Sequence, residues 1–126
     1  MPPLTDAGAL AIAKLLIGDT QTLFNNANAR LGVGDSTTAF AKTQTDLQAS
    51  TNKLRKAMDT SYPSRANAVL TFRSTFGTSE ANFAWQEWAT FNAASAGDML
   101  NRKVESLGTK TSAQSWQFTV DITVAA

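Results

Sequence analysis

The stretch from Phe83 to Phe91, FAWQEWATF, most constrains how this chain can fold. Successive side chains of an extended strand point to opposite faces of its sheet. Phe83, Trp85 and Phe91 share one parity of this stretch, whereas Trp88 takes the other. Large aromatic residues on both parities predict a central strand that is covered on both of its faces.

Other segments of the chain alternate between apolar and polar residues with the same period of two. The clearest runs from Trp116 to Val124, so we expect one of its faces in the core and the other in water. The expected strands are residues 30–33, 52–58, 68–76, 83–91, 99–105 and 116–124. With 126 residues, the sequence predicts one domain over residues 1–126, mainly β, an antiparallel β-sandwich of five to six strands with an N-terminal α-helix.

The predicted helix covers about residues 5–18. Thr5 or Asp6 supplies an N-cap, and Gly18 stands where a left-handed C-cap residue is expected. Apolar residues cover much of the circumference between Ala7 and Ile17, which predicts burial on more than one side. We favour packing on the chain's own sheet, and the alternative is packing against a neighbouring subunit.

Composition excludes several classes of function. The chain has no cysteine and no histidine, which removes disulfides, thiolate nucleophiles, the usual zinc sites and proton transfer by histidine. We therefore expect no catalytic, metal or cofactor site. The net charge of +1 predicts no nucleic-acid or anionic-membrane partner, and the apolar run from Leu10 to Ile17 is too short to cross a bilayer.

Glu87 is the one acidic residue within the aromatic stretch. A carboxylate in apolar surroundings can serve as a general acid, but a glycosidase also needs a second carboxylate across a cleft. The other glutamates, Glu80 and Glu105, fall in a turn and at a strand end. We favour a buried or half-buried ion pair of Glu87 with Arg102 or Arg73 on a neighbouring strand.

The aromatic residues permit two interpretations. Trp85, Trp88 and Phe91 could stack on carbohydrate, but aromatic residues at strand spacing more often belong to a core, and we favour that reading. The predicted core and signature residues are Phe83, Trp85, Glu87, Trp88, Phe91, Trp116 and Phe118.

The order of short motifs resembles the bacteriophage tail-collar and tail-fibre attachment family. That family has a helix of the form T-x-x-G-x-x-x-[IL]-A, a strand that ends in a V-G-D turn, a segment before a proline, and a strand of the form F-x-[IA]-x-E-[IW]-[GA]-[LVT]-[FY]-[ND]. The matching residues are Thr5, Gly8, Ile12 and Ala13, then Val33, Gly34, Asp35 and Ser36, then Tyr62 and Pro63, then Phe83 to Asn92.

The resemblance implies a non-enzymatic virion structural protein, assembled in the host cytoplasm, that binds other virion proteins and copies of itself. A tail, collar, baseplate or fibre-attachment component is expected. The alternatives are a capsid decoration protein on the major capsid protein of the head and, in another class, a carbohydrate-binding module for adsorption to the host. The expected partner contacts are Leu10, Leu15, Leu16 and Phe40, together with the loop Thr37–Ser50.

Overall fold

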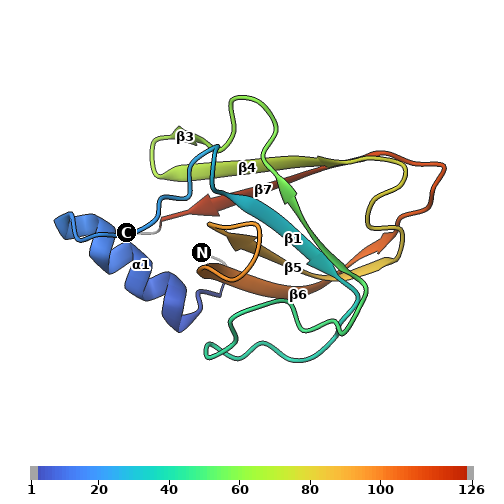
Figure 1. Cartoon of the computed structure of the whole chain (residues 1–126), viewed down its shortest axis with the longest axis horizontal. Coiled ribbons are helices and arrows are strands. Elements are labelled where there is room, and N and C mark those ends of the chain that lie inside the picture. Colours follow the sequence, from blue (N-terminus) through green and yellow to red (C-terminus); the bar gives the residue numbers. More distant parts are fainter. Residues whose placement is uncertain (1–2, 125–126) are drawn as a thin grey trace.

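The alternating segments form two antiparallel sheets in the computed structural model, which describes residues 3–124 (Figure 1). The larger sheet has the order β2 (Lys53–Ala57), β1 (Arg30–Gly34), β5 (Ala84–Phe91) and β6 (Met99–Thr109). The smaller sheet has the order β3 (Ser64–Ala66), β4 (Val69–Phe76) and β7 (Trp116–Thr123). The predicted mainly β, antiparallel fold with an N-terminal helix is confirmed.

Residues 3–124 contain seven strands, one more than the largest number expected. The additional strand is β3, which lies between the expected strands 52–58 and 68–76. Its three residues are all exposed, so no apolar period marks it, and pairing with the start of β4 holds it in place. Strand β6 also continues to Thr109, beyond its predicted end at Glu105.

The main core lies between the two sheets. Its largest buried members are Leu31, Val33, Phe72, Phe76, Trp85, Trp88, Leu100, Val120 and Ile122, which come from β1, β4, β5, β6 and β7. The ring of Trp85 makes edge-to-face contacts with Phe76, Trp116 and Phe118 at centroid distances of 4.8, 4.9 and 5.6 Å. Edge-to-face pairs of this kind stabilise a core beyond the area that they bury.

Trp85 and Trp88 point into the same core, so the prediction that they face opposite sides of β5 is wrong. The register between β5 and β6 shifts between Trp85 and Glu87. A β-bulge of this kind turns the next side chain to the other face, and a period-two reading of the sequence cannot anticipate it. Beyond the bulge, Ala89 and Phe91 belong to a second, smaller buried cluster.

The second cluster lies on the outer face of the larger sheet, beneath the segment that joins β1 to β2. Leu47 from this segment, residues 35–52, packs on Phe91, Ala89 and Met99. We call the segment the covering loop. Strand β5 is therefore covered on both faces, by the smaller sheet on one side and by the covering loop on the other, as predicted.

Helix α1 (Asp6–Ile17) begins and ends as predicted. The hydroxyl of Thr5 accepts a hydrogen bond from the Gly8 N–H at 2.9 Å and donates one to the carbonyl of Met99. Gly18 ends the helix in the left-handed conformation, with φ 76°. The caps thus fix both the length of the helix and its attachment to β6.

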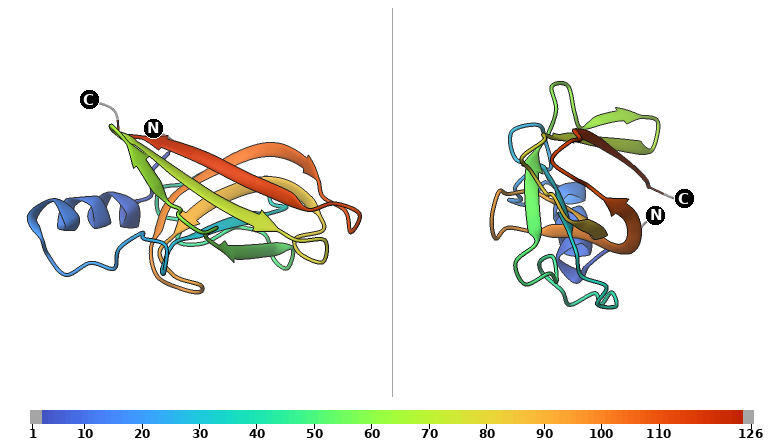
Figure 2. Two further views of the ribbon diagram at one scale, coloured as in Figure 1. Left: turned by 90° about the horizontal axis from the view of Figure 1, so that it is seen from above. Right: turned by 90° about the vertical axis from the view of Figure 1, so that its right-hand side faces the viewer.

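The predicted burial of this helix is wrong, because α1 lies at one end of the sandwich and projects beyond the sheets (Figure 2). Among the described strands it approaches only β6, where a Cβ on Gly8 would lie 2.1 Å from the carbonyl oxygen of Leu100. Only Gly8 and Ala11 are buried. The helix thus packs through Gly8 and Ala11, with Ile12 partly buried against the main core, whereas Leu10, Leu15, Leu16 and Ile17 are exposed.

Candidate functional site

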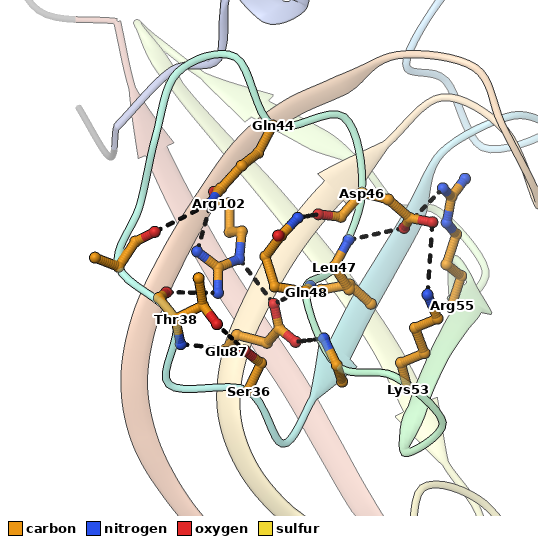
Figure 3. Close-up of polar contacts among 12 residues, drawn as sticks. Ser36, Thr38, Gln44, Asp46, Leu47, Gln48, Lys53, Arg55, Glu87 and Arg102 are labelled. Carbon is orange, nitrogen blue, oxygen red and sulfur yellow. Dashed lines mark hydrogen bonds and ion pairs between the residues drawn. The ribbon is translucent and has the colours of Figure 1, made fainter.

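Glu87 and Arg102 form an ion pair inside the protein (Figure 3). Nε of Arg102 donates to Oε1 of Glu87 at 2.7 Å, and neither side chain has any exposed surface. In the pairing of β5 with β6, Glu87 faces Val104 and Arg102 faces Ala89, so the pair crosses the two strands diagonally. Of the two cations named from the sequence, the structure therefore selects Arg102. Arg73 binds Asp59 instead, at 3.0 Å.

Both partners of this pair also hold the covering loop. The main-chain N–H groups of Gln48 and Ala49 donate to Oε1 and Oε2 of Glu87 at 2.8 and 2.9 Å. Arg102 donates to the side-chain oxygen of Gln44 at 3.1 Å and to the carbonyl of Thr38 at 2.9 Å. Each charge is thus satisfied by a partner charge and by loop groups, which is the condition under which a buried ion pair is tolerated.

Gly34 provides the space that this carboxylate occupies. It is the direct partner of Glu87 in the pairing of β1 with β5. A Cβ at this position would lie 2.4 Å from Oε2 of Glu87, closer than non-bonded atoms approach. The glycine is therefore required by close contact, and two residues of the sequence motifs, Gly34 and Glu87, form one structural unit.

Arg55 of β2 makes a second attachment of the covering loop. Its guanidinium donates to Oδ1 of Asp46 at 3.2 Å and to the carbonyls of Ala93 and Ala96, both at 2.9 Å. The same group lies 3.5 Å from the centroid of the Phe91 ring, a cation–π contact. Through Asp46, Arg55 attaches the covering loop to β2. Through the carbonyls of Ala93 and Ala96, the same side chain attaches β2 to the turn between β5 and β6.

This geometry argues against the catalytic and carbohydrate-binding readings of the aromatic stretch. Three donors occupy the two oxygens of Glu87, which has no exposed surface and so no access to a substrate. Trp85 and Trp88 are both buried, so neither indole can stack on a sugar at the surface. The aromatic residues of β5 are core residues, as the favoured reading held.

Four of the large apolar side chains that are exposed among the described residues lie on α1, and the others, Leu23, Val104 and Val124, lie elsewhere. Leu16 is 80% exposed, Ile17 77%, Leu10 56% and Leu15 39%. Leu10, Leu15 and Leu16 were expected partner contacts, and the structure brings them together on one helix. Phe40, the fourth expected contact, is half-buried in the covering loop and does not join this surface.

An apolar groove of about 380 Å³ adjoins the helix. It lies between α1 and the open end of the sandwich, and only apolar residues line it, among them Ile12, Leu15, Leu70 and Val124. The helix attaches through Gly8 and Ala11, and these small residues leave the space beside them unfilled. Exposed apolar surface of this kind marks sites of protein–protein or ligand contact.

Sequence reasoning did not find the residues with which the covering loop binds the ion pair. Two of those groups are main-chain N–H groups, which every residue except proline possesses, so no residue type marks them. Lys110 was also missed. It is buried and donates to the carbonyl of Gly77 at 2.6 Å and to the side-chain oxygen of Asn82 at 2.8 Å, which ties the end of β6 to the turn before β5.

Within residues 3–124, no group of three or more acidic side chains is placed to hold a metal ion. No helix in that range has the length and apolar character needed to cross a membrane. Comparison with protein-family models, with curated proteins and with solved structures gives no match for this chain.

Proposed function

We propose that this chain is a non-enzymatic structural protein of bacteriophage particles, a tail, collar, baseplate or fibre-attachment component that assembles through α1. The short motifs of the sequence support the phage assignment. Two of these motifs meet in the structure, since Gly34 makes room for the carboxylate of Glu87. Their pattern therefore reflects one packed unit of the larger sheet.

The observation that carries the proposal is the exposed apolar surface of α1. A leucine with four-fifths of its surface in water, next to an isoleucine exposed nearly as far, gains free energy when a partner covers it. Protein interfaces have an apolar centre and a polar rim. Leu16 and Ile17 provide such a centre at the projecting end of α1, where a partner can reach them (Figure 2).

The covering loop offers a second contact surface. Residues 37–39 and 41–43 of the loop are exposed, while its attachments at Thr38, Gln44 and Gln48 hold the main chain in place. A surface that is ordered before binding loses less conformational entropy when it binds. The buried ion pair therefore prepares the loop for contact with a neighbouring protein.

A capsid decoration protein is the alternative within the same class. It would use the same apolar helix, placed on the lattice of the head instead of around the tail. The two locations differ in which part of the particle retains the protein. The carbohydrate-binding alternative rests on Trp85, Trp88 and Phe91, and the burial of all three side chains counts against it.

The proposal is tested by mass spectrometry of purified particles, with heads and tails separated before digestion. We expect the chain in the tail fraction. We also expect a Leu16→Glu variant to fold but to be lost from particles, because a charge then lies at the centre of the contact. The matched control is Ala113→Glu, an exposed position in the turn between β6 and β7, at the end of the sandwich away from α1 (Figure 1).

The control variant should enter particles like the unmodified chain. Absence of the protein from particles overturns the proposal. Its recovery with heads alone replaces the tail assignment with capsid decoration. Incorporation of Leu16→Glu at the level of the control overturns the role assigned to α1.

A further inference from the structure

We infer that the edge of β7 that faces away from β4 binds an extended segment of another protein. The segment adds to the smaller sheet as a further strand and places an apolar side chain in a hollow between β6 and β7. The inference rests on the proposed function only in taking that protein to be a component of the particle. The observations that carry it come from the strands and do not involve α1.

Main-chain groups along this edge point outward. The Val124 N–H donates to the carbonyl of Ala68 at 2.8 Å and continues the register of β7 with β4, so the even-numbered residues of β7 are those that bond to β4. Strand β7 ends the smaller sheet, so within residues 3–124 no further strand bonds to it. The residues whose N–H and C=O groups point away from β4 are therefore the odd-numbered ones, Gln117, Thr119, Asp121 and Thr123.

Of the four edge strands in residues 3–124, β7 is the least protected against pairing with another chain. Short length, charged side chains, bulges and covering segments protect an edge. Strand β3 has only three residues, and β2 carries Lys53, Arg55 and Lys56. Residues 3–5 bond to the start of β6, and the register of β6 with β5 shifts further along. Strand β7 has eight residues, one continuous register with β4, and Asp121 as its only charge.

A hollow of about 300 Å³ lies beside this edge. Its lining includes Leu107 of β6, Trp116 and Phe118 of β7, and the buried Trp85. Leu107, Trp116 and Phe118 are only half-buried, whereas Val120, further along the same face of β7, is buried. A strand that pairs with β7 turns alternate side chains toward the larger sheet, so one of them covers Phe118 and enters the hollow.

The hollow decides between a second folded copy and an extended segment. If β7 strands of two copies paired, the inward side chains of each, such as Phe118 and Val120, would stay packed in their own sandwich and could not fill the hollow of the neighbour. A segment outside any sheet brings side chains that have no core of their own. It gains main-chain hydrogen bonds and the burial of an apolar side chain together. The partner is therefore a chain terminus or linker with apolar residues at alternate positions and no proline where it pairs.

A synthetic peptide with the sequence of residues 68–76 serves as the probe. It carries Leu70, Phe72 and Phe76 at alternate positions, with polar residues between them. Hydrogen exchange of the whole chain is followed by NMR with and without the peptide. We expect the peptide to slow exchange several-fold at residues 117, 119, 121 and 123 and to leave residues 118, 120 and 122, which already bond to β4, unchanged. The control peptide has proline in place of Thr71 and Thr75 and should have no effect.

Two results of this experiment overturn the inference. One is equal protection, or no protection, by the two peptides. The other is slow exchange at the four odd-numbered residues in the chain alone that becomes slower as its concentration rises, because a second copy then occupies the edge.

The variant Thr119→Pro tests the same edge in the particle. The N–H of residue 119 points away from β4, so proline removes only an outward donor, and the variant should fold with residues 120 and 122 still protected from exchange. The control, Thr119→Val, keeps the N–H. We expect Thr119→Val to enter particles and Thr119→Pro to be lost from them.

The particle experiment separates the inference from the proposed function. Equal incorporation of the two variants overturns the inference and leaves the proposed function in place. Absence of the unmodified chain from particles overturns the proposed function. In that case, or if Thr119→Pro fails to fold, binding of the peptide by the unmodified chain decides the inference alone.

Discussion

The variant Glu87→Gln removes one charge of the buried pair and keeps the size of the side chain. Arg102 then remains as a cation with no exposed surface, and its Nε loses the carboxylate oxygen that it reaches at 2.7 Å. The amide of glutamine carries only one acceptor oxygen. One of the two loop N–H groups, from Gln48 or Ala49, therefore faces a donor in place of an acceptor.

The size of the effect follows from these contacts. Removing one partner of a buried ion pair costs about 3–5 kcal/mol, because the other charge stays buried without compensation. A single domain is stable by roughly 5–15 kcal/mol, so the variant should lose a large share of its free energy of unfolding. With a urea m-value of about 1–3 kcal/mol per molar, the unfolding midpoint should fall by at least roughly 1 M.

Urea unfolding followed by tryptophan fluorescence measures this loss, since Trp85 and Trp88 are buried and become exposed on unfolding. Hydrogen exchange supplies a local readout, and residues 36–50 should exchange faster than the two sheets. Lys103→Met is the control. Lys103 is 47% exposed and lies 3.6 Å from Glu105, and a surface pair of this kind contributes at most about 1 kcal/mol.

A double-mutant cycle decides whether the two charges are coupled. Arg102→Met alone should destabilise about as much as Glu87→Gln alone, whereas the double variant should cost clearly less than the sum, because it leaves no unpaired buried charge. The reasoning is refuted if Glu87→Gln costs less than about 1 kcal/mol, or if the two single effects simply add.

Three further predictions concern the attachment of α1 and the ion pair of Glu80. Gly8→Ala places a methyl group 2.1 Å from the carbonyl oxygen of Leu100, so α1 should detach and lose its protection in hydrogen exchange while the sheets keep theirs. Thr5→Ala removes the N-cap and should lower the free energy of unfolding by about 1 kcal/mol, measured by urea titration; an unchanged value would contradict the role of the cap. The hydrogen bond from Lys56, at 2.7 Å, and a second one from a main-chain N–H hold the pKa of Glu80 below its ordinary value of 4.5. Stability from this group is therefore present above pH 4.5 and is lost as the pH falls below that value, so the difference in stability between the unmodified chain and Glu80→Gln should shrink in acid.

The strands with an uninterrupted period of two were predictable from the sequence. Val120 and Ile122 lie in the core, and the alternate residues Gln117, Thr119, Asp121 and Thr123 are exposed, because β7 keeps one register with β4 along its whole length. The direction of Trp85 was not predictable. It depends on a bulge between β5 and β6, and a bulge arises from the pairing of two strands and has no signature in either one.

The candidate site was also predictable only in part from the sequence. A carboxylate in an aromatic strand needs a cation, and the sequence has Arg102 and Arg73 on neighbouring segments. An ion pair of Glu87 was therefore predictable, but which of the two arginines forms it was not. The exposure of α1 was not predictable. Its apolar circumference suits burial by the sheets or by a partner equally well, and only the contact of Gly8 with Leu100 shows which surface turns inward.

The attachment of the covering loop to Glu87 has a consequence for how this protein tolerates sequence change. The carboxylate binds the main-chain N–H groups at positions 48 and 49, not their side chains. At the exposed position 48, any residue except proline can therefore stand without loss of its hydrogen bond, whereas at position 49, where Ala49 is buried, the side chain must also be small. The loop can diverge to suit a different neighbour while a single glutamate in the sheet keeps its course unchanged.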